Sequence, residues 1–146
     1  MSGTSIDKNI YSNLIEGLKI QNIYLNDLKL DNVNREIKGN SLSVKLDCEF
    51  DKNRNIKGEI LEVFPSFSVQ VFSSEDISQA AFHIDTQFYI KYEIKNLANF
   101  EEMYIDTFIN QNIPLNIWPY IRELISSLST RIGFPALVIE PFTIKR

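Results

Sequence analysis

The stretch NIWPYIRELISSLSTRIGFP, residues 116–135, decides the fold, because it predicts a long helix with little charge along its length. Pro119 fits the first turn of such a helix, where its missing N–H costs nothing, and Gly133 followed by Pro135 would end it. At about 100° per residue, the apolar side chains fall within an arc of roughly 140°, which predicts a face packed on a sheet. These side chains are Ile117, Tyr120, Ile121, Leu124, Ile125, Leu128 and Ile132.

Small hydroxyl side chains take the opposite side of this helix, where Lys and Glu usually lie. They are Ser126, Ser127, Ser129 and Thr130. Small side chains let another backbone approach closely and lose little entropy on burial. Two interpretations stay open: the hydroxyls face water, or the helix is sandwiched between subunits, with Arg122 and Glu123 available for an interfacial ion pair.

The sequence before this helix has the pattern of an antiparallel sheet. Apolar and polar residues alternate over 42–50 and 82–94, as in strands with one buried face. Two more strands are expected over 18–30, with Ile23 and Leu25 on the face opposite the other apolar residues, and over 59–72, where Pro65 would mark an edge or a bulge. Residues 51–58 are predicted to be a charged turn.

Helical patterns lie on both sides of the predicted strands. Residues 5–18 carry apolar side chains at a spacing of four, which favours a short N-terminal helix. Asn99 and Glu102 resemble a capping box and predict a short helix over 99–108, with a break at 111–114 before the long helix. Strands followed by helices predict an α+β fold, with a four-stranded antiparallel sheet and a short and a long helix on one face.

Composition excludes several classes of function. A chain of 146 residues fits one domain, and a net charge of −4 argues against nucleic acid and favours a basic partner if the partner is charged. Cys48 is the single cysteine and no apolar run suits a bilayer, so we expect a cytoplasmic protein that is not an integral membrane protein. With one histidine, His83, and no glycine-rich phosphate loop, we expect no metal, no cofactor and no enzyme. A binding surface remains.

Three stretches resemble the SecB protein-export chaperones: KIQNIYLNDLKLD at 19–31, VKLD at 44–47 and WPYIRELISSLSTRIGFPAL at 118–137. The last is the most specific, and its matching positions are Pro119, Tyr120, Arg122, Glu123, Ile125, Arg131, Phe134 and Pro135. The resemblance implies a single SecB-like domain over 18–146, preceded by an extension over 1–17. It also implies a homotetramer, a dimer of dimers, that holds unfolded preproteins in apolar grooves without ATP and passes them to the motor SecA.

The resemblance also assigns residues to these roles. The client groove would include Leu42, Val44, Leu46 and Cys48, although ordinary core packing explains them as well. Asp27, Asp31 and Asp85 match the acidic face offered to SecA, although strand solvation is the simpler explanation. The oligomer interface would include Tyr120, Arg122, Glu123, Ser126, Ser127 and Thr130. The family commonly ends in a further helix and an acidic tail, whereas this sequence stops at Arg146, so we expect a more open groove or a narrower clientele.

Several functions compete at this point. The leading hypothesis is a SecB-like holdase for non-native polypeptides, most directly preproteins for export. A narrower version is a chaperone dedicated to one client, such as the antitoxin of a toxin–antitoxin system. From another class, a curved sheet closed by an amphipathic helix could enclose a small molecule or a lipid. An oligomeric adaptor without chaperone activity is the remaining alternative.

Overall fold

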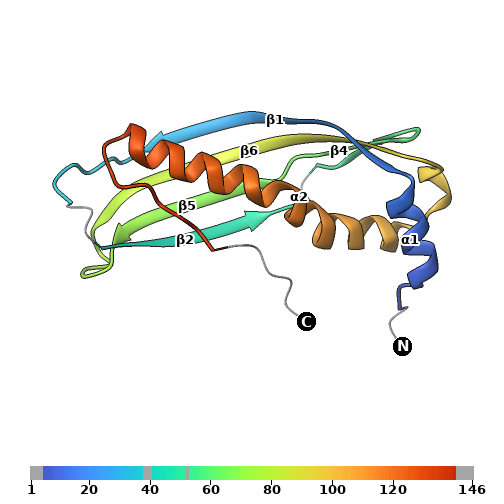
Figure 1. Ribbon diagram of the computed structural model, residues 1–146, viewed down its shortest axis with the longest axis horizontal. Helices are drawn as coiled ribbons and strands as arrows, with labels where there is room; N and C mark the ends of the chain where they lie inside the picture. Colours follow the sequence, from blue (N-terminus) through green and yellow to red (C-terminus); the bar gives the residue numbers. More distant parts are fainter. Residues whose placement is uncertain (1–4, 38–40, 52, 141–146) are drawn as a thin grey trace.

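The protein is a six-stranded antiparallel sheet with one long helix covering one face (Figure 1). The computed structural model describes residues 5–37, 41–51 and 53–140. The strands are β1 (Leu18–Asp31), β2 (Leu42–Glu49), β3 (Asn55–Lys57), β4 (Ile60–Val63), β5 (Ser66–Ser73) and β6 (Ala80–Ile94). The helices are α1 (Lys8–Glu16), the 3-10 turn η1 (Leu97–Asn99) and α2 (Glu102–Arg131). The predicted α+β class is confirmed, but the predicted count of four strands is wrong.

β6 is the central strand of the sheet. It pairs with β1 along one side and with β5 and then β4 along the other, while β2 and β3 lie outside β5 and β4. The alternation predicted for β6 is confirmed, because its apolar residues form the buried, helix-facing row. That row consists of Phe82, Ile84, Phe88, Ile90, Tyr92 and Ile94. β1 therefore forms one edge of the described sheet, and β2 and β3 lie at the other.

The two additional strands come from the segment around Pro65. The single strand predicted over 59–72 is divided into β4 and β5, with Pro65 between them, where its carbonyl accepts a hydrogen bond from the Phe88 N–H at 2.9 Å. The predicted charged turn contains β3, which forms a hairpin with β4 through Gly58 at φ 59°. Arg54 joins this hairpin to α2 through Asp106, with Nη2 and Oδ1 2.6 Å apart.

Two β-bulges in β1 place its apolar residues on one face. The register of β1 against β6 shifts between Ile20 and Asn22 and again between Leu25 and Asp27. Each shift adds one residue and therefore reverses the alternation. As a result Ile23 and Leu25, predicted to point the other way, share the helix-facing side with Ile20 and lie opposite buried residues of β6.

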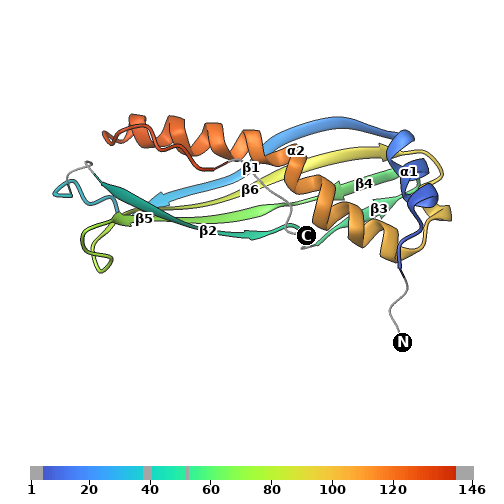
Figure 2. The same cartoon turned by 60° about the horizontal axis from the view of Figure 1, so that its bottom comes forward.

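α2 is one continuous helix of 30 residues, so the break predicted at 111–114 is wrong. Pro114 and Pro119 both lie inside it and each removes one hydrogen bond of the helix. Ile113 and Ile117 are fully buried on either side of Pro114, and this packing on the sheet holds the helix together. Its axis bends near the middle, as expected at proline (Figure 2). The predicted capping box is also wrong, because the helix begins after Glu101, whose side chain makes no cap bond.

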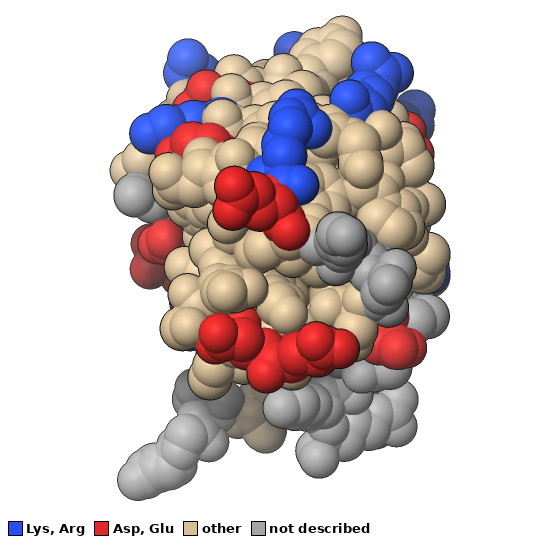
Figure 3. All heavy atoms as spheres, turned by 90° about the vertical axis from the view of Figure 1, so that its left-hand side faces the viewer, with Lys and Arg blue, Asp and Glu red and all other residues tan. Residues whose placement is uncertain are grey.

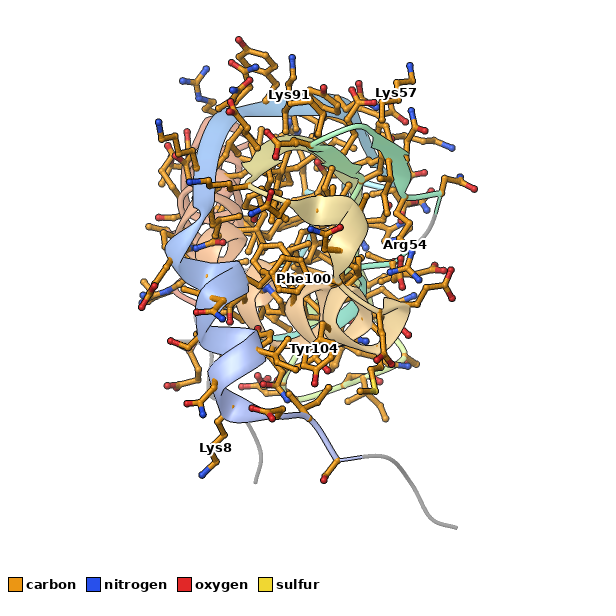
Figure 4. The ribbon with its side chains drawn as sticks, turned by 90° about the vertical axis from the view of Figure 1, so that its right-hand side faces the viewer. Lys8, Arg54, Lys57, Lys91, Phe100 and Tyr104 are labelled. Atoms are coloured by element: carbon orange, nitrogen blue, oxygen red, sulfur yellow. The ribbon has the colours of Figure 1, made fainter. Side chains whose placement is uncertain are left out.

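α1 docks at the N-terminal end of α2, where Phe100 and Tyr104 lie (Figure 4). The Asp7 carboxylate caps α1 by accepting from the Asn9 N–H at 2.8 Å, and Leu14 is fully buried. The Tyr11 hydroxyl donates to Asn112 of α2 at 3.0 Å. No helix in the described ranges has a stretch long and apolar enough to cross a membrane.

Candidate functional site

The helix-facing side of β2 carries a row of apolar residues at the edge of the sheet. This row, the β2 row, consists of Leu42, Val44, Leu46 and Cys48. Val44 and Leu46 lie opposite the fully buried Val71 and Val69 of β5, but they are themselves only half-buried. An edge strand has a neighbour on one side only, so this row keeps apolar surface within reach of another chain.

Aromatic rings gather at the Cys48 end of the β2 row. Phe67, opposite Cys48, contacts the rings of Phe50, Phe88 and Trp118 at centroid distances of 5.9, 6.1 and 6.4 Å. Cys48 as a whole is exposed, but neighbouring atoms partly desolvate its thiol and raise its pKa to about 11, with the Asp47 charge adding to the shift. The thiol is therefore neutral at pH 7 and behaves as a small apolar group.

Residues 134–140, here named the strap, turn back along the flank of α2 that faces β2 (Figure 1). Gly133 at φ 95° makes the reversal, and the Phe134 N–H donates to the Ser129 carbonyl at 2.9 Å. The Phe134 ring packs on Phe82 of β6 at 5.2 Å, and Ile139 is 8% exposed. The strap thus covers part of the helix flank without forming a helix or a strand.

Two side chains of α2 hold the far end of the strap by its backbone. Trp118 Nε1–H donates to the carbonyl of Glu140 at 2.7 Å, and Arg122 Nε–H donates to the carbonyl of Ile139 at 3.0 Å. Arg122, expected at a subunit interface, therefore has an intramolecular partner. Neither bond was foreseen, because a helical pattern does not reveal which segment returns to the helix.

The hydroxyl-rich side of α2 differs in part from the prediction. Ser129 is fully buried and donates to the Ile125 carbonyl at 2.6 Å, so its placement away from the sheet is wrong. Ser126 and Ser127 are half-buried, while Thr130 is exposed.

Tyr120 and Glu123 lie on a side of α2 that the strap leaves open. By helical geometry, Tyr120 is about 160° around the axis from both Trp118 and Arg122. Its side chain is 47% exposed. With Pro119 and Glu123 it lines a hollow of about 280 Å³. Three exposed apolar residues of β1, Ile20, Leu25 and Leu28, belong to the same helix-facing side of the sheet.

The outer face of the sheet carries a cluster of carboxylates. Asp27 and Asp85 line one hollow of about 340 Å³ together with Asp47 and Glu49 of β2, and these four residues are named the outer acidic cluster. Asp47 and Glu49 were missed, although the alternation of β2 put them on the face opposite the β2 row. The order of the strands, which brings β2 near β1 and β6, was the missing information.

Asp31, the third acidic candidate, lies beside His83. Its Oδ1 is 3.3 Å from His83 Nδ1, while His83 Nε2 is 3.3 Å from Asp85 Oδ1 and hydrogen-bonds with Ser68 at 3.0 Å. His83 therefore bridges β1, β5 and β6 on the outer face. Figure 3 looks at the end of the molecule where β1 ends, and shows a band of Asp and Glu side chains low on this face, with others among the Lys and Arg side chains above it.

A sheet with a long helix on one face and an apolar row on an edge strand belongs to the class of folds that can bind an extended polypeptide. The space between α2 and the sheet is filled by fully buried side chains such as Ile84, Ile117 and Ile121, which favours a polypeptide over an enclosed small ligand. The chain belongs to the SecB family: the sequence model of the family described as Preprotein translocase subunit SecB matches residues 12–145.

Individual relatives agree with this assignment. The chain is 28% identical over 121 residues to the protein-export protein SecB of Bartonella bacilliformis, covering 81% of this chain and 72% of the relative. It is 28% identical over 127 residues to that of Pseudomonas putida, covering 84% and 73%. Its fold is similar to that of the SecB-like chaperone of Mycobacterium tuberculosis, solved in complex with a ChAD peptide from the HigA1 antitoxin, with a TM-score of 0.77, 17% identity and coverage of 95% and 100%.

Proposed function

We propose that this protein is a holdase that binds extended apolar segments of non-native polypeptides on the β2 row, without ATP. The observation that carries the proposal is an apolar row on an edge strand that the protein leaves half-buried. Each client side chain buried there would gain about 1.5–3 kcal/mol. Several shallow sites joined in one assembly multiply their affinities through effective concentration. Preproteins for export are the clients that the family implies.

The test is suppression of aggregation of a chemically denatured protein by near-stoichiometric amounts of this chain, without nucleotide. Leu46→Gln should weaken client affinity about tenfold, because losing one buried apolar contact costs about 1.4 kcal/mol or more. Lys45→Gln is the matched control, since Lys45 lies on the same strand but points to the outer face. No suppression by the wild type, or equal effects of both variants, would contradict the proposal.

A chaperone dedicated to one client is the second candidate. The SecB-like chaperone of Mycobacterium tuberculosis supports this candidate, because it has a similar fold and was solved in complex with an antitoxin peptide. The same assay separates the two candidates when a panel of unrelated denatured proteins is compared with any antitoxin found to be encoded beside the gene of this chain. A general holdase should protect most of the panel, whereas a dedicated one should protect a single partner.

We further propose that the outer acidic cluster, with Asp31, docks a basic partner such as SecA. Charges of one sign gathered on one face speed the approach of an opposite charge and lose their effect in salt. Asp85→Asn should therefore weaken binding of SecA in a pull-down at low salt and leave aggregation suppression intact. Equal SecA binding by the variant would remove Asp85 from this role.

A further inference from the structure

Besides the packing of its apolar side chains, the strap is held by contacts that any polypeptide could make. Its two described hydrogen bonds to α2 side chains are accepted by main-chain carbonyls, those of Ile139 and Glu140. Every residue has such a carbonyl, so Trp118 and Arg122 do not distinguish one sequence from another. A site that binds the backbone of an extended segment irrespective of its side chains is what a holdase needs.

Side-chain contacts of the strap are few and alternate. Leu137 is half-buried and Ile139 is buried, while Val138 between them is 77% exposed. This is the pattern of an extended peptide with one apolar face. Among the described residues, positions 135–140 make no hydrogen bond to the backbone of another element. The segment is therefore attached less firmly than the strands beside it.

The strap and the β2 row span the same stretch of the sheet. At one end, Phe134 contacts Phe82, which pairs with Val71, the neighbour of Val44. At the other end, Trp118 binds Glu140 and packs on Phe67, the neighbour of Cys48. A client lying along the row from Val44 to Cys48 would therefore meet the strap along its length.

We propose that strap residues 136–140 occupy the site to which a client binds. An extended client segment displaces them and takes over the hydrogen bonds from Trp118 and Arg122. The inference rests on the proposed function and adds two binding residues and a built-in competitor. The apparent affinity for clients is then reduced by the fraction of molecules whose strap is closed.

Hydrogen exchange of the strap amides, with and without a denatured client, tests the displacement. Exchange at Ala136–Glu140 should rise when the client binds, while exchange in α2 stays slow. Because Trp118 is the single tryptophan of the chain, its fluorescence should change in the same titration. Slower exchange of the strap on client binding would overturn the inference, since the client would then be packing over it.

Three substitutions test the competition directly. Ile139→Ser loosens the strap and should tighten client binding about fivefold, whereas Val138→Ser, at an exposed neighbour, should leave it unchanged. In the Ile139→Ser background, Trp118→Phe keeps an aromatic ring but removes the donor, and should weaken client binding again about threefold. Weaker binding by Ile139→Ser alone would mean that the strap forms part of the binding wall, and would overturn the inference.

The outcomes also separate this inference from the function on which it rests. If neither the wild type nor Ile139→Ser binds any client, the proposed function fails and the inference fails with it. If clients bind and the strap stays protected, the inference fails alone.

Discussion

At the scale of single residues, the chemistry lies in positions that periodicity does not mark. The sequence assigned Arg122 to a subunit interface and gave Trp118 no role, yet both donate to the backbone of the strap. His83, noted in the sequence only as the single histidine, hydrogen-bonds with Ser68 and lies between Asp31 and Asp85. Asp47 and Glu49 lie beside Asp27 and Asp85 only because distant strands become neighbours. Tertiary contacts bring such residues together, and a single sequence does not reveal those contacts.

Cys48 gives a prediction at this scale. With its pKa raised to about 11, chiefly by partial burial, the thiol has little thiolate at pH 8, so alkylation by iodoacetamide should be one to two orders of magnitude slower than for a free cysteine of pKa about 8.5. The rate should keep rising with pH beyond 9 where a free thiol levels off. The unfolded chain in urea serves as the control. A native rate equal to that of the unfolded chain would contradict the desolvation of this thiol.

At the scale of elements, prediction succeeded where one face of a strand is buried and the other is exposed to solvent. β6 alternates between buried and more exposed residues from Phe82 to Ile94, and the residue types of β2 alternate as well, because α2 covers one side of the sheet only. The prediction failed at β1, where two bulges reverse the alternation, and at α2, where burial of Ile113 and Ile117 outweighs two prolines. A bulge depends on the partner strand and the helix depends on the sheet beneath it, so neither is visible in local sequence.

The hydroxyl residues of α2 give the prediction at this scale. Ser129→Leu should lower the free energy of unfolding by about 1–3 kcal/mol, because Ser129 is fully buried and the larger side chain overpacks the site. Thr130→Leu, at the exposed next position, should change it by less than about 0.5 kcal/mol. Urea denaturation measures both. Similar losses for the two variants would mean that Ser129 is not enclosed as described.

At the scale of the whole molecule, exposed apolar residues on the helix-facing side lie along the edge of the sheet and on the open side of α2. Leu25 of β1 is 47% exposed, and Tyr120 of α2 lines an open hollow. Exposed apolar edge strands are usually covered in native proteins. We propose that a second copy covers β1 and the Tyr120 side of α2, as in the tetramer that the family resemblance implies.

Leu25→Glu should therefore dissociate the assembly, since it places a charge in an apolar interface. Ile77→Glu is the matched control, because Ile77 is 78% exposed in the turn between β5 and β6. Native mass spectrometry or light scattering would show a smaller species for the first variant and the wild-type mass for the second. A monomeric wild type would refute the proposed assembly outright.

The pairing of β1 with β6 also determines when the protein can finish folding during its own synthesis. Leu18 pairs with Ile94 and Asp31 with His83, so β1 leaves the ribosome long before its partner exists. Roughly 50 to 75 residues must still be translated, which takes about 3 to 15 s at about 5–20 residues per second. During that interval the apolar face of β1 is exposed to solvent. A nascent chain of this chaperone thus passes through the same vulnerable condition as the polypeptides it is proposed to protect.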